Sequence, residues 1–229
     1  MLQTELGHIE PVISALARKR PDVAAHCRRV ADYSVRLATQ LGLGPRDIET
    51  VRLGALLHDV GKMLVPARIL DKPGRPTDRE WQELRIHPEL GVEIAHRSGF
   101  DDEVCGIVLY HHERWDGRGY PDGLGERSIP YLVRLVSVMD TYDALTSSRD
   151  YRGRLTPEAA RALIARGSGT KFCPWMTSAF LAMPLEAMRP AAEHAPSAVR
   201  HPEGPGPLTA GELSGLWPLS AAAREVCQC

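Results

Sequence analysis

The chain has 229 residues, 43% of them hydrophobic, which is enough for the core of one domain and too little for two equal domains. Its formal net charge of −1 excludes a generally basic surface that would hold a nucleic acid polymer by its phosphates. Five cysteines without disulfide spacing, no signal-peptide pattern and no apolar run of membrane-spanning length predict a cytoplasmic protein without a membrane span.

Helical periodicity runs through most of the chain, and no segment alternates with a period of two, so an all-α fold is expected. Helices are predicted over residues 8–19, 22–41, 45–64, 77–86, 88–97, 101–112, 131–147, 156–167 and 176–188. We expect a lead-in helix within residues 1–21, one helical bundle domain over 22–189, and a disordered Pro/Ala/Gly-rich tail over 190–229.

Several of these helices carry start signals. Asp22 is expected to cap the second helix, and Thr77 followed by Glu80 forms a capping-box pattern. The His87–Pro88 step predicts a kink or a restart, because proline disfavours helix in the residue before it.

Seven residues with metal-ligating side chains fall on the buried parts of these helices. Imidazoles and carboxylates are costly in an apolar bundle unless they are paired, hydrogen-bonded or coordinated. Each alone has a simpler explanation, such as a polar contact at a helix end, but all seven together indicate a cation site. The set consists of His26, His58, Asp59, His87, His111, His112 and Asp140.

The chemistry of this set bears on the kind of metal. Histidine and aspartate without a thiolate favour iron or manganese over a structural zinc. Adjacent residues on a helix point about 100° apart, so His58 and Asp59 reach one site only if it is wide. A centre of two metals bridged by Asp59 would be wide enough.

Residues 111–124 read HHERWDGRGYPDGL, so the histidine pair runs directly into a glycine-rich loop. Gly117 and Gly119 permit close approach of the backbone, as at the edge of an active site. Tyr120 is expected to pack on a base, while Glu113 is a candidate either for orienting a histidine or for general acid catalysis.

Three stretches together resemble the HD-GYP family, a subclass of the HD phosphohydrolases. They are HDVGK at 58–62, HHERWDGRGYPDGL, and DTYDALTSSRDYR at 140–152. The resemblance covers residues from about 22 to about 180. It implies a metal-dependent phosphodiesterase that hydrolyses cyclic di-GMP to pGpG, and in some members on to GMP.

The resemblance also implies roles for individual residues. The family's metal ligands fall on the seven residues reached above, with Asp59 and Lys62 as catalytic positions. Lys62, Gly119, Tyr120, Arg149 and Arg152 match substrate-binding positions. Three-metal members have a glutamate where this chain has Asp22, so we expect two divalent cations and no third.

Two departures from the family pattern are visible. The family reads G-x-x-F-D-P near its end, where this chain has GTKFCP with Cys173 in place of aspartate. We expect a local packing change there and retained activity. Family members usually carry an N-terminal sensory domain, so regulation is expected from a separate sensory or regulatory protein.

Two other readings stay open. The HD motif alone also suits a phosphohydrolase that acts on another nucleotide, although the loop around Tyr120 argues against it. A non-catalytic module that binds cyclic di-GMP or a partner protein is the third reading, and the complete ligand set argues against it.

Overall fold

The computed structural model describes residues 2–147 and 155–188, and these form an all-helical fold. The expectation of an all-α fold is confirmed: within the described ranges there is no strand, only two isolated β-bridges. The elements are α1 (Leu2–Lys19), α2 (Pro21–Gln40), α3 (Pro45–Leu57), η1 (Val60–Leu64), α4 (Ala67–Leu70), α5 (Asp78–Arg85), α6 (His87–Arg97), α7 (Asp102–Tyr110), η2 (Glu126–Ser128), α8 (Tyr131–Thr146), α9 (Pro157–Arg166), α10 (Pro174–Leu181) and η3 (Leu185–Met188).

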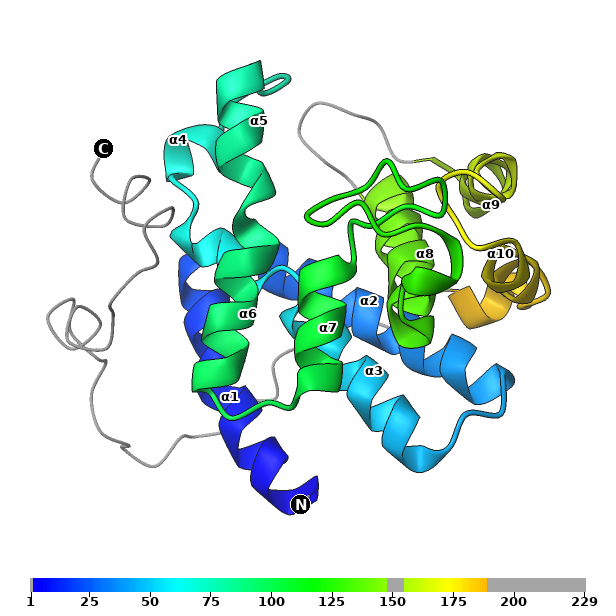
Figure 1. Cartoon of the computed structure of the whole chain (residues 1–229), viewed down its shortest axis with the longest axis horizontal. Coiled ribbons are helices and arrows are strands. Elements are labelled where there is room, and N and C mark those ends of the chain that lie inside the picture. The colour runs from blue at the N-terminus through cyan, green and yellow to red at the C-terminus, as the bar shows by residue number, and fades with distance from the viewer. Residues whose placement is uncertain (1, 148–154, 189–229) are drawn as a thin grey trace, which may run out of the picture. The chain divides into compact units, whose positions relative to one another are not determined.

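The core forms where α2, α3, α7 and α8 pack together (Figure 1). α2 lies against α3 and α8, while α7 lies against α3 and α6. Fully buried side chains from three of these helices, among them Leu37, Val51 and Met139, fill the space between them. None of the described helices is both long and apolar enough to span a membrane. The tail predicted over 190–229 lies outside the described residues.

α2 begins one residue earlier than expected, and the prediction that Asp22 caps it is wrong. Arg20 occupies the N-cap position, and Pro21 takes the first helical position, where its missing N–H is not needed. The exposed Asp22 carboxylate instead accepts hydrogen bonds from the Arg20 guanidinium, at 3.0 Å and 3.2 Å.

The predicted helix over 45–64 is interrupted at the HD motif. α3 ends at Leu57, and the chain resumes as the 3₁₀-helix η1 after His58 and Asp59. The interruption brings Gly61 against the backbone of α6: a Cβ at Gly61 would stand 2.0 Å from the His87 carbonyl oxygen. His58 and Asp59 therefore lie on a turn and not on one regular helix.

Other helix starts follow the predicted signals. Thr77 and Glu80 form the capping box of α5, Asp101 caps α7, and Thr156 caps α9. A new helix, α6, starts at His87 as predicted.

Two segments differ from expectation. The segment between the helices predicted over 45–64 and 77–86, for which no helix was expected, contains the short helix α4. The predicted helix over 176–188 is split into α10 and η3, because Pro184 lacks the N–H that would continue the first of them.

Candidate metal centre

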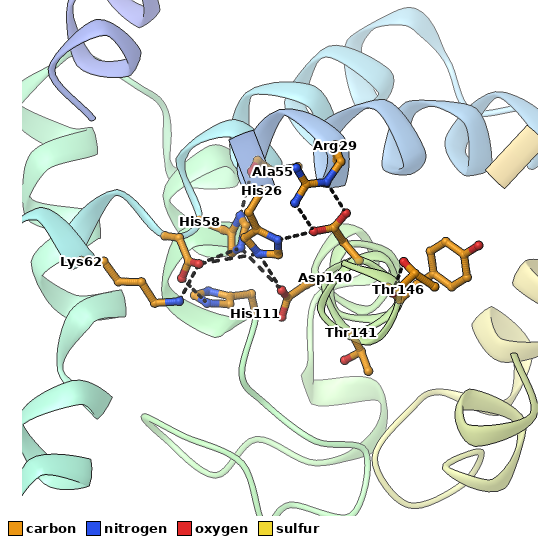
Figure 2. A network of polar contacts seen from close by, with 12 residues as sticks. His26, Arg29, Ala55, His58, Lys62, His111, Asp140, Thr141 and Thr146 are labelled. Atoms are coloured by element: carbon orange, nitrogen blue, oxygen red, sulfur yellow. Dashed lines mark hydrogen bonds and ion pairs between the residues drawn. The ribbon is translucent and has the colours of Figure 1, made fainter. Parts of the chain in front are cut away.

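The seven predicted ligand residues come from five places in the chain and meet in one buried cluster. His26 lies on α2, His58 and Asp59 lie between α3 and η1, and His87 begins α6. His111 and His112 follow α7, and Asp140 lies on α8. Figure 2 shows His26, His58, His111 and Asp140 pointing toward a common centre, with Lys62 beside it.

The cluster consists of two groups of possible ligands. In each group the ligand atoms lie within 4.8 Å of one another. The first group contains Asp59, His87, His111 and His112, and the second contains His26, His58 and Asp140.

Asp59 lies between the two groups, and its two carboxylate oxygens face different ones. Oδ1 is 3.2 Å from Nε2 of His87 and 3.8 Å from Nε2 of His111. Oδ2 is 3.4 Å from Nε2 of His58 and 3.7 Å from Nε2 of His26. Ligand atoms about 2.1 Å from one cation are roughly 3.0–3.4 Å from each other. The carboxylate is therefore placed as a ligand shared by two cations would be.

Three of the histidines are held by the same hydrogen bond. Nδ1 of His58, His87 and His111 donates to the carbonyl oxygen three residues earlier, at 2.7–2.8 Å in each case. A carbonyl oxygen only accepts, so Nδ1 of each carries a proton and Nε2 faces the cluster. In His87 and His111, whose pKa burial lowers, Nε2 presents a lone pair.

These lone pairs leave the cluster short of a donor. Nε2 of His87 and Nε2 of His111 are 3.4 Å apart, although both are acceptors in this arrangement. Nε2 of His58 and Oδ1 of Asp59 are buried without a hydrogen-bond partner. Buried polar atoms normally have partners, and bound cations would supply them, so the residues fit a metal centre.

Asp143, which was not predicted as a site residue, holds His26 in place. The Asp143 carboxylate is almost fully buried, and Oδ2 lies 2.6 Å from Nδ1 of His26. It also accepts two hydrogen bonds from the Arg29 guanidinium, at 2.7 Å and 2.9 Å (Figure 2). Asp143 is three residues after Asp140, so both lie on one face of α8.

The protonation states suit cation binding. Burial lowers the pKa of His87 and His111 and brings that of His112 to about 3, so these imidazoles are neutral at pH 7. Burial alone would raise the pKa of Asp59, but Lys62 and His58 hold it well below its usual value. Burial would lower the pKa of His26, yet hydrogen bonds to the Asp140 and Asp143 carboxylates raise it to about 9. Burial would likewise lower the pKa of His58, but the neighbouring Asp59 carboxylate raises it well above its usual value. In the absence of metal, protons on His26 and His58 thus take the place of cations.

Cys27 adds a ligand type that was not anticipated. Its Sγ and one ligand atom each of His58 and Asp59 lie within 4.8 Å of one another. The thiol is fully buried in a small apolar cluster with Leu16 and Val23.

A cavity of about 350 Å³ opens beside the first group. Asp59, His87, His112 and Asp140 form its polar end, where Nζ of Lys62 is 2.6 Å from Oδ2 of Asp59. The remaining lining residues are Trp81, Leu84, Tyr120, Thr141, Ala144, Leu145, Ser147 and Lys171. Trp81 and Lys171 were not predicted as site residues.

The GYP loop, residues 117–124, is fastened to the histidine pair. The Glu113 Oε1 accepts hydrogen bonds from the backbone N–H groups of Asp122 and Gly123, at 2.8 Å and 2.9 Å. A Cβ at Gly119 would stand 2.5 Å from the Cα of Glu113, so only glycine fits there. Glu113 thus orients the loop and does not contact a ligand histidine through these bonds.

Tyr120 lines the cavity beside the His111–His112 pair. Its ring stacks on His112, with 4.7 Å between ring centroids, and the guanidinium of Arg85 lies 4.5 Å from the Tyr120 centroid. Its predicted contact with a base stays a prediction. Arg149 and Arg152 lie outside the described residues, so their predicted phosphate contacts stay predictions as well.

Cys173, the departure from the family pattern, stands at the N-cap of α10 and makes no capping hydrogen bond. Its Sγ is 4.0 Å from Nη1 of Arg134, whose Nε is buried without a hydrogen-bond partner. With cysteine at this position, the partly buried Arg134 guanidinium has no carboxylate partner from residue 173.

The HD domain family model matches residues 10–174 of the chain. A cyclic di-GMP phosphodiesterase of Vibrio cholerae is 40% identical over 187 residues, which cover 75% of this chain and 38% of that protein. The 3'3'-cGAMP-specific phosphodiesterase 2 of the same species is 36% identical over 170 residues, covering 73% of this chain and 33% of that protein. Bd1817, a HDG"Y"P protein from Bdellovibrio bacteriovorus, has a structure that matches with a TM-score of 0.58 and 26% identity, over 73% of this chain and 55% of that chain. The chain spans well under half the length of these curated relatives.

Proposed function

The chain belongs to the HD domain family, in the HD-GYP subclass that its motifs indicate, and from this premise we propose that it is a metal-dependent phosphodiesterase that hydrolyses cyclic di-GMP to pGpG. The observation that carries the proposal is the placement of Asp59 between two ligand groups, with one carboxylate oxygen toward each. A single metal would need only one such group.

The residues divide into two sets of ligands in this proposal. Asp59, His87, His111 and His112 would hold one divalent cation. His26, His58 and Asp140 would hold the other, together with Oδ2 of Asp59, which faces His58 and His26. The ligand atoms of each set are nitrogen and oxygen, and this favours iron or manganese. Cys27 is not needed as a ligand in either set. When bound, the cations supply Lewis acidity for phosphodiester hydrolysis.

The protein's own groups position the substrate and the ligands. Lys62, beside Oδ2 of Asp59, is placed to contact a phosphate at the polar end of the cavity. Asp143 fixes the ring of His26, and Glu113 fixes the loop that carries Gly119 and Tyr120.

Asp22 would not hold a third cation. Its carboxylate is 62% exposed and paired with Arg20, and it belongs to none of the possible ligand groups among the described residues. A third metal is therefore not part of the proposal, and pGpG is the expected main product.

The test combines metal analysis with a substrate panel. Protein purified without oxygen should contain two iron or manganese ions per chain and hydrolyse cyclic di-GMP. The panel should include 3'3'-cGAMP, a mononucleotide, and bis(4-nitrophenyl) phosphate. Turnover of the mononucleotide alone would support the other-nucleotide phosphohydrolase, and cyclic di-GMP binding without turnover would support the non-catalytic module.

We also propose a cytoplasmic location and control by a separate protein. The free cysteines among the described residues, Cys27, Cys105 and Cys173, suit the cytoplasmic location expected from the sequence. Control by a separate sensory protein also stays part of the proposal, and co-purification from the native host would test it.

A further inference from the structure

Lys171 is a cation on the wall of the cavity that the metal centre does not use. It precedes Phe172 and Cys173 in the segment between α9 and α10, and its Nζ donates to Oγ1 of Thr141 at 3.0 Å. A neutral hydroxyl is its hydrogen-bond partner, and no ion pair with a carboxylate is seen for it among the described residues. Burial lowers the pKa of Lys171, which reflects the cost of keeping its charge there.

Lys62, the other lysine of the cavity, is arranged differently. Its Nζ is only 2.6 Å from Oδ2 of Asp59, so its charge already has a protein partner. Lys171 is the lysine whose charge an incoming anion could still pair with. The two lysines come from different elements, since Lys62 lies on η1 and Lys171 lies beside α8.

The position of Lys171 is fixed by the backbone around it. Its carbonyl oxygen accepts from the N–H of Trp115 at 3.2 Å, and that of Thr170 accepts from the N–H of Asp116 at 2.8 Å. The next side chain, Phe172, is buried in the main core. The segment is thus tied to the chain that leads from the histidine pair into the GYP loop, so the ammonium group is held ready before a ligand binds.

A cyclic dinucleotide carries two phosphates, and only one of them can lie at the metal ligands during hydrolysis. Thr141, the partner of Lys171, directly follows Asp140, so the Lys171 ammonium lies next to the metal centre and not within it. Leu145 and Ser147, at the C-terminal end of α8, also line the cavity. A second phosphate bound in this part of the cavity would need a cation as its partner.

Resting on the proposed function, we propose that Lys171 binds the second, non-reacting phosphate of the cyclic dinucleotide and thereby selects substrates with two phosphates. An ammonium group that contacts a phosphate in both the ground state and the transition state lowers KM more than it raises kcat. The effect should be absent for a diester that has only one phosphate.

The experiment compares two substrates on four proteins: the wild type, Lys171→Gln, Lys171→Arg and the control Lys19→Gln, which changes an exposed lysine on α1. Gln keeps a donor for Thr141 and removes the charge. For cyclic di-GMP, Lys171→Gln should raise KM about 10- to 100-fold, as expected for loss of a charge-assisted hydrogen bond. Lys171→Arg should recover most of that loss.

For bis(4-nitrophenyl) phosphate, which has one phosphate, all four proteins should have the same KM, and their metal content should be equal. Equal changes on both substrates, or none on either, would overturn the role of Lys171. A wild-type protein that cleaves bis(4-nitrophenyl) phosphate and no cyclic dinucleotide would instead refute the proposed function, and the role of Lys171 with it. The two failures are therefore distinguishable by the wild type alone.

Discussion

Replacing Asp59 with asparagine tests the two-metal arrangement most directly, because the amide keeps the shape of the side chain and removes its charge. Oδ1 lies 3.2 Å from Nε2 of His87, and Oδ2 lies 3.4 Å from Nε2 of His58. One substitution therefore removes a charged ligand from both proposed cations.

The expected size of the effect follows from this shared position. Loss of a residue that only orients a metal ligand weakens metal binding about 10- to 100-fold. A loss of at least that size at each of two cations multiplies to about 10²- to 10⁴-fold for the pair. Asp143→Asn is the matched comparison, since Asp143 contacts His26 and not the first ligand group. It should show only the single-site loss, about 10- to 100-fold.

The assay is metal content of protein purified without oxygen, together with turnover of cyclic di-GMP. Asp59→Asn should lose both metals and turnover, while Asp143→Asn should lose mainly one metal. Helical content should match the wild type, because Asp59 lies between α3 and η1. Asp32→Asn, an exposed position on α2, is the control and should change nothing. An Asp59→Asn protein that keeps both metals and still turns over substrate would refute the bridging role.

Three further predictions concern positions around the centre. Asp22→Ala should leave metal stoichiometry unchanged and cost only about 0.2–1 kcal/mol of stability, because an exposed ion pair is lost; a fall from three metals to two would show that Asp22 is a ligand. Replacing Arg149 and Arg152 together with glutamine should raise KM for cyclic di-GMP more than it lowers kcat, and unchanged kinetics would remove them from the site. In Cys173→Asp, the new carboxylate should cap α10 and accept a hydrogen bond from Arg134. The free energy of unfolding should rise by about 1 kcal/mol and Tm by about 2–4 °C, with activity retained. A lower Tm would show that the space around the thiol cannot hold a carboxylate.

Local signals were sufficient to predict most of the helices and the seven residues that meet in the candidate metal centre. Capping residues such as Thr77 and Asp101 act within one turn, so sequence alone places them well. The interruption of the helix over 45–64 has a different origin. There, Gly61 lies against the backbone of His87, a residue of another helix. The sequence of residues 45–64 alone does not predict that contact.

Asp143 and Lys171 were not predicted as site residues, again because their contacts come from distant parts of the chain. Asp143 looks like one polar residue on an apolar helix until His26, 117 positions away, is seen to be its partner. Lys171 looks like a solvent-exposed lysine in a loop, and only the pairing of its backbone with Trp115 brings it to the cavity. Their roles are set by tertiary neighbours. The i, i+3 spacing of Asp140 and Asp143 was the one local signal available.

The hydrogen bonds from three histidines to carbonyl oxygens also bear on the ends of helices. The acceptors belong to Ala55, Leu84 and Val108, each in the last turn of its helix, where carbonyl groups lack partners within the helix. Each imidazole therefore does what a C-terminal capping group does in other proteins. The three candidate metal ligands therefore also cap the C-terminal ends of α3, α5 and α7, so a substitution at any of them should loosen a helix end as well as the candidate metal centre.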